Sequence, residues 1–143
     1  MTPVVLDASV AAKWLLPAAA EPFIEQANRL LAEEATGRVE FTVPDLFWPE
    51  IGNIAWKAVR ARRFTAEEAA DSLATARNWK FQTVSSRQLL QPALEIGLLY
   101  DRSFYDSVYL ALAVSQHATL VTADERLVNA VGAHLPVKWL GAM

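Results

Sequence analysis

The chain of 143 residues is 53% hydrophobic, with a formal net charge of −3, no cysteine and only two histidines. A chain of this length fits one domain and can bury about 70% of its unfolded surface, so we expect residues 1–143 to form a single domain. The lack of cysteine excludes disulfides, thiolate metal sites and cysteine nucleophiles. His117 and His134 are too few for a histidine-rich zinc site, and the slightly acidic charge does not by itself indicate nucleic-acid binding.

The start of the chain does not have the pattern of a signal peptide, because Asp7 and then Lys13 interrupt its apolar run. The most apolar stretch, SVYLALAVS, is shorter than the roughly 20 residues that a membrane span needs. We therefore expect a soluble, cytoplasmic protein that does not contact a membrane.

Short apolar segments suited to strands alternate with segments of helical periodicity along the chain. In chain order, strands are predicted at 3–6, 40–44, 81–85, 118–122 and 136–140. Helices are predicted at 9–16, 21–36, 45–63, 65–79, 87–96, 103–117 and 124–132. Thr65 and Glu68 form a capping-box pattern at the start of the fourth helix. This alternation favours an α/β fold in which helices flank a central parallel sheet of four to five short strands.

Four acidic residues stand where predicted strands end or predicted helices begin. Asp7 directly follows the first strand, and Asp124 comes just after the fourth. Glu50 lies early in the helix after the second strand, and Asp106 lies early in the helix that starts near Ser103. Because open parallel sheets bind ligands beyond the carboxyl ends of their strands, we expect the four side chains to share one edge. Taken singly, each has a plainer explanation as a helix cap or a first-turn acid.

Taken together, the four acids favour a metal site. Glu50 and Asp106 have mostly apolar neighbours in sequence, and acids are rarely buried unless they are paired. Carboxylates that converge in a poorly solvated place repel one another, and a divalent cation removes that repulsion. A set of oxygen ligands without cysteine or histidine suits Mg²⁺ or Mn²⁺.

Four segments of the chain, VLDASVAAKWLLP, PEIGNIAWKAV, YDSVYLALA and TADERL, resemble in this order the acidic motifs of PIN-domain ribonucleases. The resemblance extends from Asp7 to about Leu127 and is nearest to the VapC toxins of toxin–antitoxin pairs. It implies a three-layer PIN-like fold and Mg²⁺- or Mn²⁺-dependent hydrolysis of phosphodiester bonds in RNA by an endoribonuclease. It also implies a VapB-like antitoxin as a partner, and a homodimer.

The resemblance assigns the catalytic role to four acids: Asp7, Glu50, Asp106 and Asp124. It implies that Asp7, Asp106 and Asp124 hold the metal, directly or through water. Glu50 is either a further ligand or the group that orients the attacking water, and the sequence leaves both roles open. It also leaves open whether one metal ion or two are bound.

Three polar residues match supporting positions of the family beside the acids: Ser9, Asn53 and Thr122. Ser9 also has a simple explanation as a helix-start residue, and Thr122 as a β-branched strand residue. Trp14 is a candidate for the antitoxin interface, because aromatic side chains are enriched at such surfaces; the alternative is that it belongs to the core.

An RNA substrate needs a local basic surface on a chain whose net charge is −3. The end of helix 45–63 offers a basic cluster: Lys57, Arg60, Arg62 and Arg63. The helix dipole also favours cations at this position, without any RNA. Lys13 and Arg102 stand closer in sequence to the acidic motifs and are equally good candidates.

Other protein classes fit the sequence less well. A receiver domain of phosphorelay signalling also binds Mg²⁺ at strand ends, but it needs an aspartate after the third strand, where this chain has Ser85 and Ser86. A phosphatase of the haloacid-dehalogenase type needs an acid two residues after Asp7 and finds Ser9. A Walker-type nucleotidase would need a glycine-rich phosphate loop, which the sequence lacks. The non-enzymatic alternative is a PIN-like module that only binds an antitoxin or RNA.

Overall fold

The computed structural model describes residues 1–18 and 21–143 of the chain. Within these ranges one sheet contains the strands β1 (Thr2–Leu6), β2 (Val39–Pro44), β3 (Gln82–Val84), β4 (Thr119–Thr122) and β5 (Val137–Trp139). Their spatial order is β3-β2-β1-β4-β5, and every neighbouring pair is parallel. The predicted α/β class with a central parallel sheet is confirmed.

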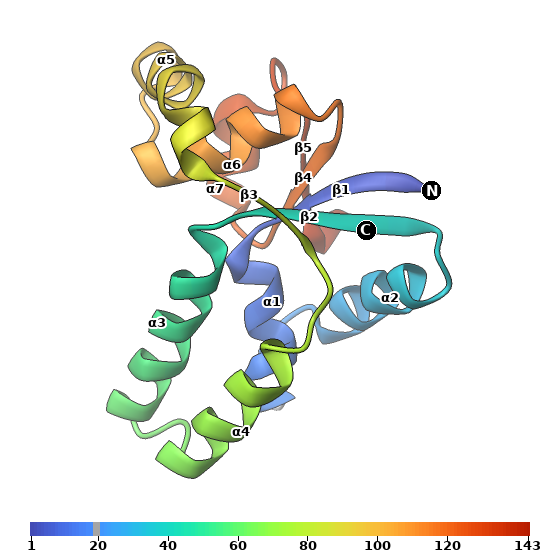
Figure 1. Cartoon of the computed structure of the whole chain (residues 1–143), viewed down its shortest axis with the longest axis vertical. Coiled ribbons are helices and arrows are strands. Elements are labelled where there is room, and N and C mark those ends of the chain that lie inside the picture. Colours follow the sequence, from blue (N-terminus) through green and yellow to red (C-terminus); the bar gives the residue numbers. More distant parts are fainter. Residues whose placement is uncertain (19–20) are drawn as a thin grey trace.

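Helices cover both faces of this sheet, which gives three layers (Figure 1). The layer below the sheet in Figure 1 contains α1 (Ala8–Leu15), α2 (Ile24–Ala35), α3 (Phe47–Arg60) and α4 (Ala66–Ala76). The layer above it contains α5 (Leu90–Tyr100) and α6 (Phe104–Ser115), and α7 (Glu125–Val131) connects β4 to β5. Among the described residues, no helix is both long and apolar enough to cross a membrane.

The order of the strands reverses direction at β1. From β1 the chain moves outward through β2 to β3, and it then returns to the other side of β1 to form β4 and β5. Because crossovers between parallel strands are right-handed, this reversal puts the connecting helices on opposite faces. The switch in strand order lies between β1 and β4, and open α/β sheets bind ligands beyond the carboxyl ends of their strands at such a switch.

Helix α6 is buried over most of its length and packs beside that switch in strand order. Its residues Ser107–Ala113 are all buried, and the helix packs against β1, β2 and β4. The buried hydroxyl of Ser107 donates to the carbonyl oxygen of Ser103 at 2.7 Å, so it keeps a hydrogen bond inside the core. Side chains near the start of α6 are therefore held in a fixed position relative to the sheet.

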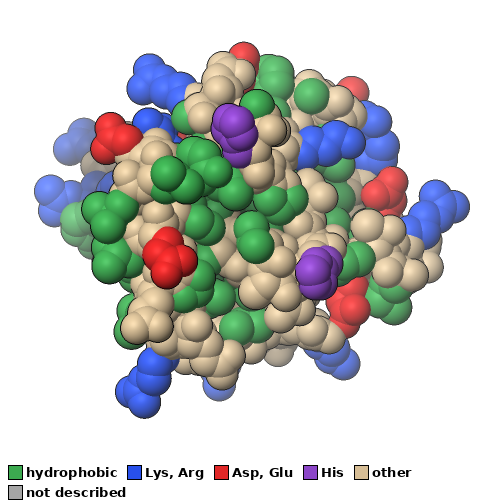
Figure 2. Space-filling model, turned by 90° about the horizontal axis from the view of Figure 1, so that it is seen from above, with side chains coloured by type: hydrophobic (Ala, Val, Ile, Leu, Met, Phe, Trp, Pro, Cys, Tyr) green, Lys and Arg blue, Asp and Glu red, His purple; other side chains and the backbone are tan. Residues whose placement is uncertain are grey.

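Helix α5 presents an apolar face to solvent. Leu90, Leu94 and Leu98 follow one another at four-residue spacing, and with Leu99 their exposed fractions are 51%, 52%, 76% and 74%. Figure 2 looks onto this side of the molecule and shows hydrophobic side chains gathered on its surface. Contiguous exposed apolar surface of this kind is typical of an interaction site.

Several predicted helix ends differ from the structure: the helices predicted at 45–63 and 65–79 are Phe47–Arg60 and Ala66–Ala76, and two further helices differ for a visible reason. The helix predicted to begin at Glu21 begins at Ile24, because Phe23 adopts a left-handed backbone conformation with φ of 62°. The helix predicted at 87–96 starts as a 3-10 turn and continues as α5 to Tyr100. Neither difference moves a residue of the acidic motifs.

Candidate functional site

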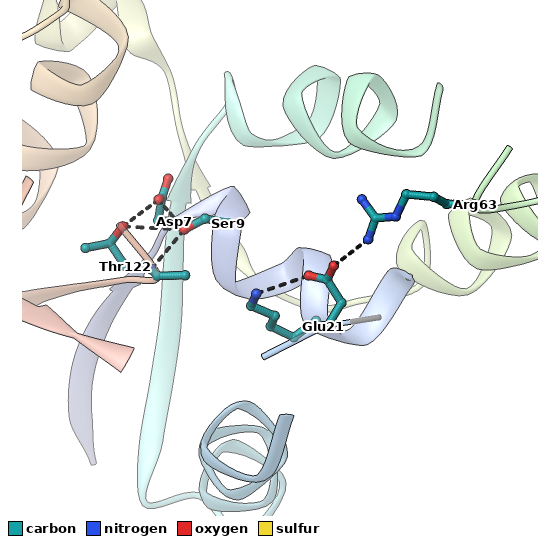
Figure 3. A network of polar contacts seen from close by, with 7 residues as sticks. Asp7, Ser9, Glu21, Arg63 and Thr122 are labelled. Carbon is teal, nitrogen blue, oxygen red and sulfur yellow. Dashed lines mark hydrogen bonds and ion pairs between the residues drawn. The ribbon is translucent and has the colours of Figure 1, made fainter. Parts of the chain in front are cut away.

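Asp7 lies between β1 and α1, and two hydroxyl groups hold its carboxyl group (Figure 3). Ser9 Oγ donates to Asp7 Oδ2 at 2.5 Å, and Thr122 Oγ1 donates to the same oxygen at 2.8 Å. Each hydroxyl also accepts a backbone N–H from the segment after β4: Ser9 from Ala123 at 3.0 Å, and Thr122 from Asp124 at 3.1 Å. The two hydroxyls therefore tie the ends of β1 and β4 together around Asp7.

The position of Asp7 is unfavourable for a negative charge. Protein atoms surround its carboxyl group, although part of the residue still reaches solvent. Burial raises the pKa of Asp7, and the charge of Asp106 raises it further, while the hydrogen bonds from Ser9 and Thr122 lower it in part. Its side chain does not cap α1. The capping explanation of Asp7 therefore does not hold.

Glu50 lies in the first turn of α3 and is held from α6. Tyr109 Oη donates to Glu50 Oε1 at 2.7 Å. Burial is the main cause that raises the pKa of Glu50; the Tyr109 hydroxyl lowers it, and the charges of Asp7 and Asp106 raise it. The pKa of Tyr109 is itself raised by burial and by the charges of Asp7 and Glu50, so its hydroxyl stays protonated and remains a donor.

Tyr109 is the residue of this site that the sequence analysis missed. It lies three residues after Asp106, and residues at this spacing are neighbours on one side of a helix. The signal that could have found it is a tyrosine one turn after an acid, within the apolar stretch of α6 where small and aliphatic residues predominate. Its partner Glu50 stands 59 residues earlier in the chain, which no local pattern reveals.

Asp106 and Asp124 complete the acidic edge in different surroundings. Burial raises the pKa of Asp106, and Asp124 raises it further, while the Ser103 hydroxyl and the Arg102 charge lower it. Asp124 is exposed and is the N-cap of α7, where its Oδ1 accepts from two backbone amides of the first turn at 3.0 and 3.4 Å. The capping explanation therefore holds for Asp124, through one of its two oxygens.

The four acids form one electrostatically coupled group. The charge of Asp106 raises the pKa of Asp7, and the charges of Asp7 and Asp106 raise the pKa of Glu50. The charge of Asp124 raises the pKa of Asp106. In the part of the chain that the structure describes, no lysine or arginine forms an ion pair with any of them. Arg102 is close enough to lower the pKa of Asp106 but makes its hydrogen bond to a backbone carbonyl instead. The edge therefore carries negative charge that the described side chains do not balance.

The donor set of this edge fits a hard divalent cation. All the candidate ligands are carboxylate or hydroxyl oxygens, which Mg²⁺ and Mn²⁺ prefer. Over residues 1–18 and 21–143, no three acidic or histidine side chains are already closed around a common point. Carboxylates that have no cation between them repel one another, which favours an open arrangement.

Two of the other predicted residues, Asn53 and Lys13, form no hydrogen bond or ion pair with the four acids among the described residues. Asn53 is exposed on α3 one turn after Glu50, and among the described residues it makes no hydrogen bond to an acid of the site. Lys13 is buried in an ion pair, with its Nζ 3.1 Å from Glu21 Oε1. Glu21 also accepts from Arg63 at 2.8 Å (Figure 3). Lys13 and Arg63 therefore share one carboxylate, which offsets only part of their combined positive charge.

The remaining basic candidates are exposed or partly exposed. Lys57, Arg60 and Arg62 are exposed around the end of α3, and the guanidinium of Arg60 lies 5.2 Å from the ring centre of Trp56. Arg102 is partly buried beside Asp106. Of these, Arg102 lies nearest to the acidic edge.

Trp14 is partly buried and makes several contacts within the chain. Its Nε1 donates to the carbonyl oxygen of Ala27 at 3.1 Å. Its ring lies against Phe41, with centres 6.0 Å apart, and meets the ring of Trp79 edge-on at 5.8 Å. These contacts are those of a residue at the border of the core, and the interface role of Trp14 stays a prediction.

The fold and the acidic edge define a parallel α/β domain with a carboxylate site at the switch in strand order. A family model described as PIN domain matches residues 4–132 of the chain. Ribonuclease VapC3 of Pyrobaculum aerophilum is 30% identical over 127 residues, which cover 86% of this chain and 90% of that protein. The chain belongs to the PIN-domain family.

Solved structures of two toxin systems have the same fold. VapC20 of Mycobacterium tuberculosis, described as a toxin that cleaves the sarcin–ricin loop, matches with a TM-score of 0.66 and 16% identity over 92% of this chain and 95% of that one. A chain of a toxin–antitoxin complex from Klebsiella pneumoniae matches with a TM-score of 0.60 and 13% identity over 96% and 97%. At these identities the two matches support the fold alone.

Proposed function

We propose that the chain is a Mg²⁺- or Mn²⁺-dependent endoribonuclease and the toxin of a toxin–antitoxin pair, folded as one domain over residues 1–143. The observation that carries the proposal is the unbalanced acidic edge, where Asp7, Glu50 and Asp106 all have raised pKa values. Membership of the PIN-domain family, and the ribonuclease name of a relative with 30% identity, support RNA as the substrate.

The chain's own contacts suggest how each acid acts. Hydroxyl groups occupy Oδ2 of Asp7, and backbone amides occupy Oδ1 of Asp124, so we assign the other oxygen of each to the metal, together with Asp106. When bound, a divalent cation lowers the pKa of a water molecule and offsets charge on the phosphate oxygens. Glu50, held by Tyr109, lies across the edge and either completes the ligand set or orients the attacking water.

The phosphate backbone of the substrate needs cations near the acids. We assign this role first to Arg102, which acts on Asp106 and has no carboxylate partner among the described residues. Lys57 and Arg60 are exposed candidates further along α3. Lys13 is the weakest of the predicted contacts, because it is already paired with Glu21.

Two protein partners belong to this proposal. We assign the exposed leucine face of α5 to a second copy of the chain, because an apolar surface of this size favours burial on association. The second partner is a VapB-like antitoxin, and Trp14 remains a candidate for contact with it. Sedimentation of the purified chain alone and with Leu98→Glu tests the dimer, which the charged residue should disrupt.

The test of the activity is cleavage of a mixed RNA pool by the purified protein with Mg²⁺ or Mn²⁺, and with EDTA. The matched control is Asp106→Asn, which keeps the size of the side chain and removes its charge. Cleavage that requires the metal and disappears in the variant supports the proposal. Cleavage that persists in the variant contradicts the assigned site. RNA binding without any metal-dependent cleavage favours the non-catalytic module instead.

A further inference from the structure

A second site candidate lies on the other side of α3 from the acids. A cavity of about 500 Å³ opens between α3, α4 and β3, and its lining includes Trp48, Gly52, Arg77, Trp79, Phe81 and Thr83. Successive residues of a helix are turned by about 100°, so Glu50 points away from Trp48 and Gly52 and reaches Tyr109 on α6. One helix therefore carries an acidic side and an aromatic side.

The ring of Phe81 is nearly parallel to the rings of both tryptophans of this cavity. The ring centres of Trp48 and Phe81 are 6.1 Å apart with an angle of 27° between the planes. Those of Trp79 and Phe81 are 5.1 Å apart with an angle of 24°. Phe81 is buried, while Trp48 and Trp79 are partly exposed and form the walls of the cavity. A flat aromatic ligand fits such walls, because stacked rings prefer offset, near-parallel planes.

Contacts within the protein already hold the rings of Trp48 and Trp79 in place without a ligand. Trp48 Nε1 donates to Thr83 Oγ1 at 3.1 Å, which anchors the ring to β3. Trp79 meets the edge of Trp14 with its centre 5.8 Å away. Because the rings are already oriented, little conformational entropy is lost when a ligand binds.

The charge at the cavity favours a nucleotide over an apolar peptide side chain. Arg77 lines the cavity, is exposed and forms no ion pair among the described residues. Lys80 lies exposed three residues further along the chain. On a chain of net charge −3, phosphate attraction alone is weak, and proteins that bind single strands add base stacking on aromatic side chains to it.

We propose that this cavity receives an unpaired base of the RNA substrate, stacked against Trp48 and Trp79, with Arg77 at a neighbouring phosphate. The proposal rests on the ribonuclease function above and names a subsite for it; the base must be unpaired, because the bases of a duplex are not available for stacking. The same side of α3 continues four residues after Gly52 to Trp56, which is 57% exposed under the guanidinium of Arg60. Trp56 offers a second stacking surface along the path of the strand.

The test fills the cavity without removing any wall. A Cβ atom built on Gly52 meets no heavy atom within 4 Å, so Gly52→Leu places a side chain in open space, and leucine is a better helix former than glycine. Gly52→Ala is the matched control, because it changes helix propensity without filling the cavity. Both variants should melt at or above the temperature of the wild type.

Binding is measured in EDTA, which keeps the RNA intact, by fluorescence anisotropy with a labelled twelve-nucleotide oligoadenylate. We expect Gly52→Leu to weaken this binding by about five- to 150-fold, the loss that removal of one stacked base produces, and Gly52→Ala to bind like the wild type. Binding of the same strand annealed to oligouridylate should be equal in all three proteins. Arg77→Gln should lower the salt dependence of single-strand binding by about one phosphate contact.

Three outcomes overturn the proposal. If Gly52→Leu binds and cleaves single-stranded RNA as the wild type does, the stacking site is wrong and the ribonuclease function stands. If Gly52→Leu keeps its RNA affinity but loses a copurifying antitoxin, the cavity is a peptide site. If the wild type neither binds the oligoadenylate nor cleaves any RNA with Mn²⁺, the ribonuclease function itself is wrong, and the stacking site falls with it.

Discussion

The ends of β1 and β4 lie side by side, yet the acid that follows each strand has a different environment. Asp7 is surrounded by protein, does not cap its helix, and has a raised pKa. Asp124 is exposed and caps α7 through two backbone amides. A capping carboxylate stabilises the fold by itself, whereas a buried carboxylate that lacks a cation destabilises it. Asp124 therefore stabilises the fold as a helix cap, whereas the stability of the fold gives no reason for the buried carboxylate of Asp7.

The largest effect should come from Asp7→Asn. Asparagine still accepts hydrogen bonds from Ser9 and Thr122 but has no charge for a metal, so we expect RNA cleavage to fall at least about 100-fold, a loss of about 2.7 kcal/mol in transition-state stabilisation. The folded state should not lose stability, since the unfavourable buried charge is gone. Initial rates on a fluorogenic RNA and a thermal melt check both parts. Full activity in this variant would remove Asp7 from the mechanism.

Divalent cations should offset the loss of folding stability that the repelling carboxylates of the acidic edge cause. A ligand that binds only the folded state at 100 times its Kd stabilises it by about 2.7 kcal/mol, so Mg²⁺ or Mn²⁺ should raise the melting temperature of the wild type. Asp7→Asn should lose most of this increase. Melts of both proteins with each ion and with EDTA measure the difference. An equal increase in both proteins would mean that the ions bind elsewhere.

The stability of the metal-free protein should fall as the pH rises from mildly acidic to neutral values. The pKa values of Asp7, Glu50 and Asp106 are raised in the folded state, so the folded chain holds protons that the unfolded chain has released, and stability declines through that range. The sign is opposite to that of a salt-bridged acid. Urea unfolding in EDTA at a series of pH values tests this, and the slope should be smaller for Asp7→Asn than for the wild type.

The smallest effect concerns the cap at Asp124. Replacement of an N-cap aspartate by alanine costs about 1 kcal/mol, while asparagine caps almost equally well. We therefore expect Asp124→Ala to lower the free energy of unfolding in EDTA by about that amount and Asp124→Asn to leave it nearly unchanged. Denaturant titrations of the two variants measure this difference in the free energy of unfolding. If both variants lost the same stability, the charge of Asp124 and not its hydrogen bonds would stabilise α7.

The sequence alone predicted the structural features that depend on residues close together in the chain. The capping box predicted from Thr65 and Glu68 is present, with backbone-to-side-chain distances of 3.0 and 3.1 Å. The parallel sheet followed from the alternation of strand and helix patterns, and strand order then brings the segments after β1 and β4 to one edge. These features depend on periodicity and on residues a few positions apart, which a single sequence contains.

The sequence alone did not predict contacts between residues that lie far apart in the chain. The hydrogen bond from Tyr109 to Glu50 joins two helices that no spacing rule connects. Lys13 looked free to contact RNA, but it is paired with Glu21, which also pairs with Arg63. The environment that raises the pKa of Asp7 comes from the packing of several segments around it. Such contacts depend on tertiary packing, which local patterns do not encode.

The pairing of β1 with β4 has a consequence for synthesis of the protein. Ser9 and Thr122, which together hold Asp7, are separated by 113 residues. The nascent chain leaves the ribosome from its N-terminus, so β1 and β2 can meet early, but the partner strand β4 emerges only in the last fifth of translation. The acidic edge is therefore assembled last. A site built in this order stays incomplete until synthesis of the chain is almost finished.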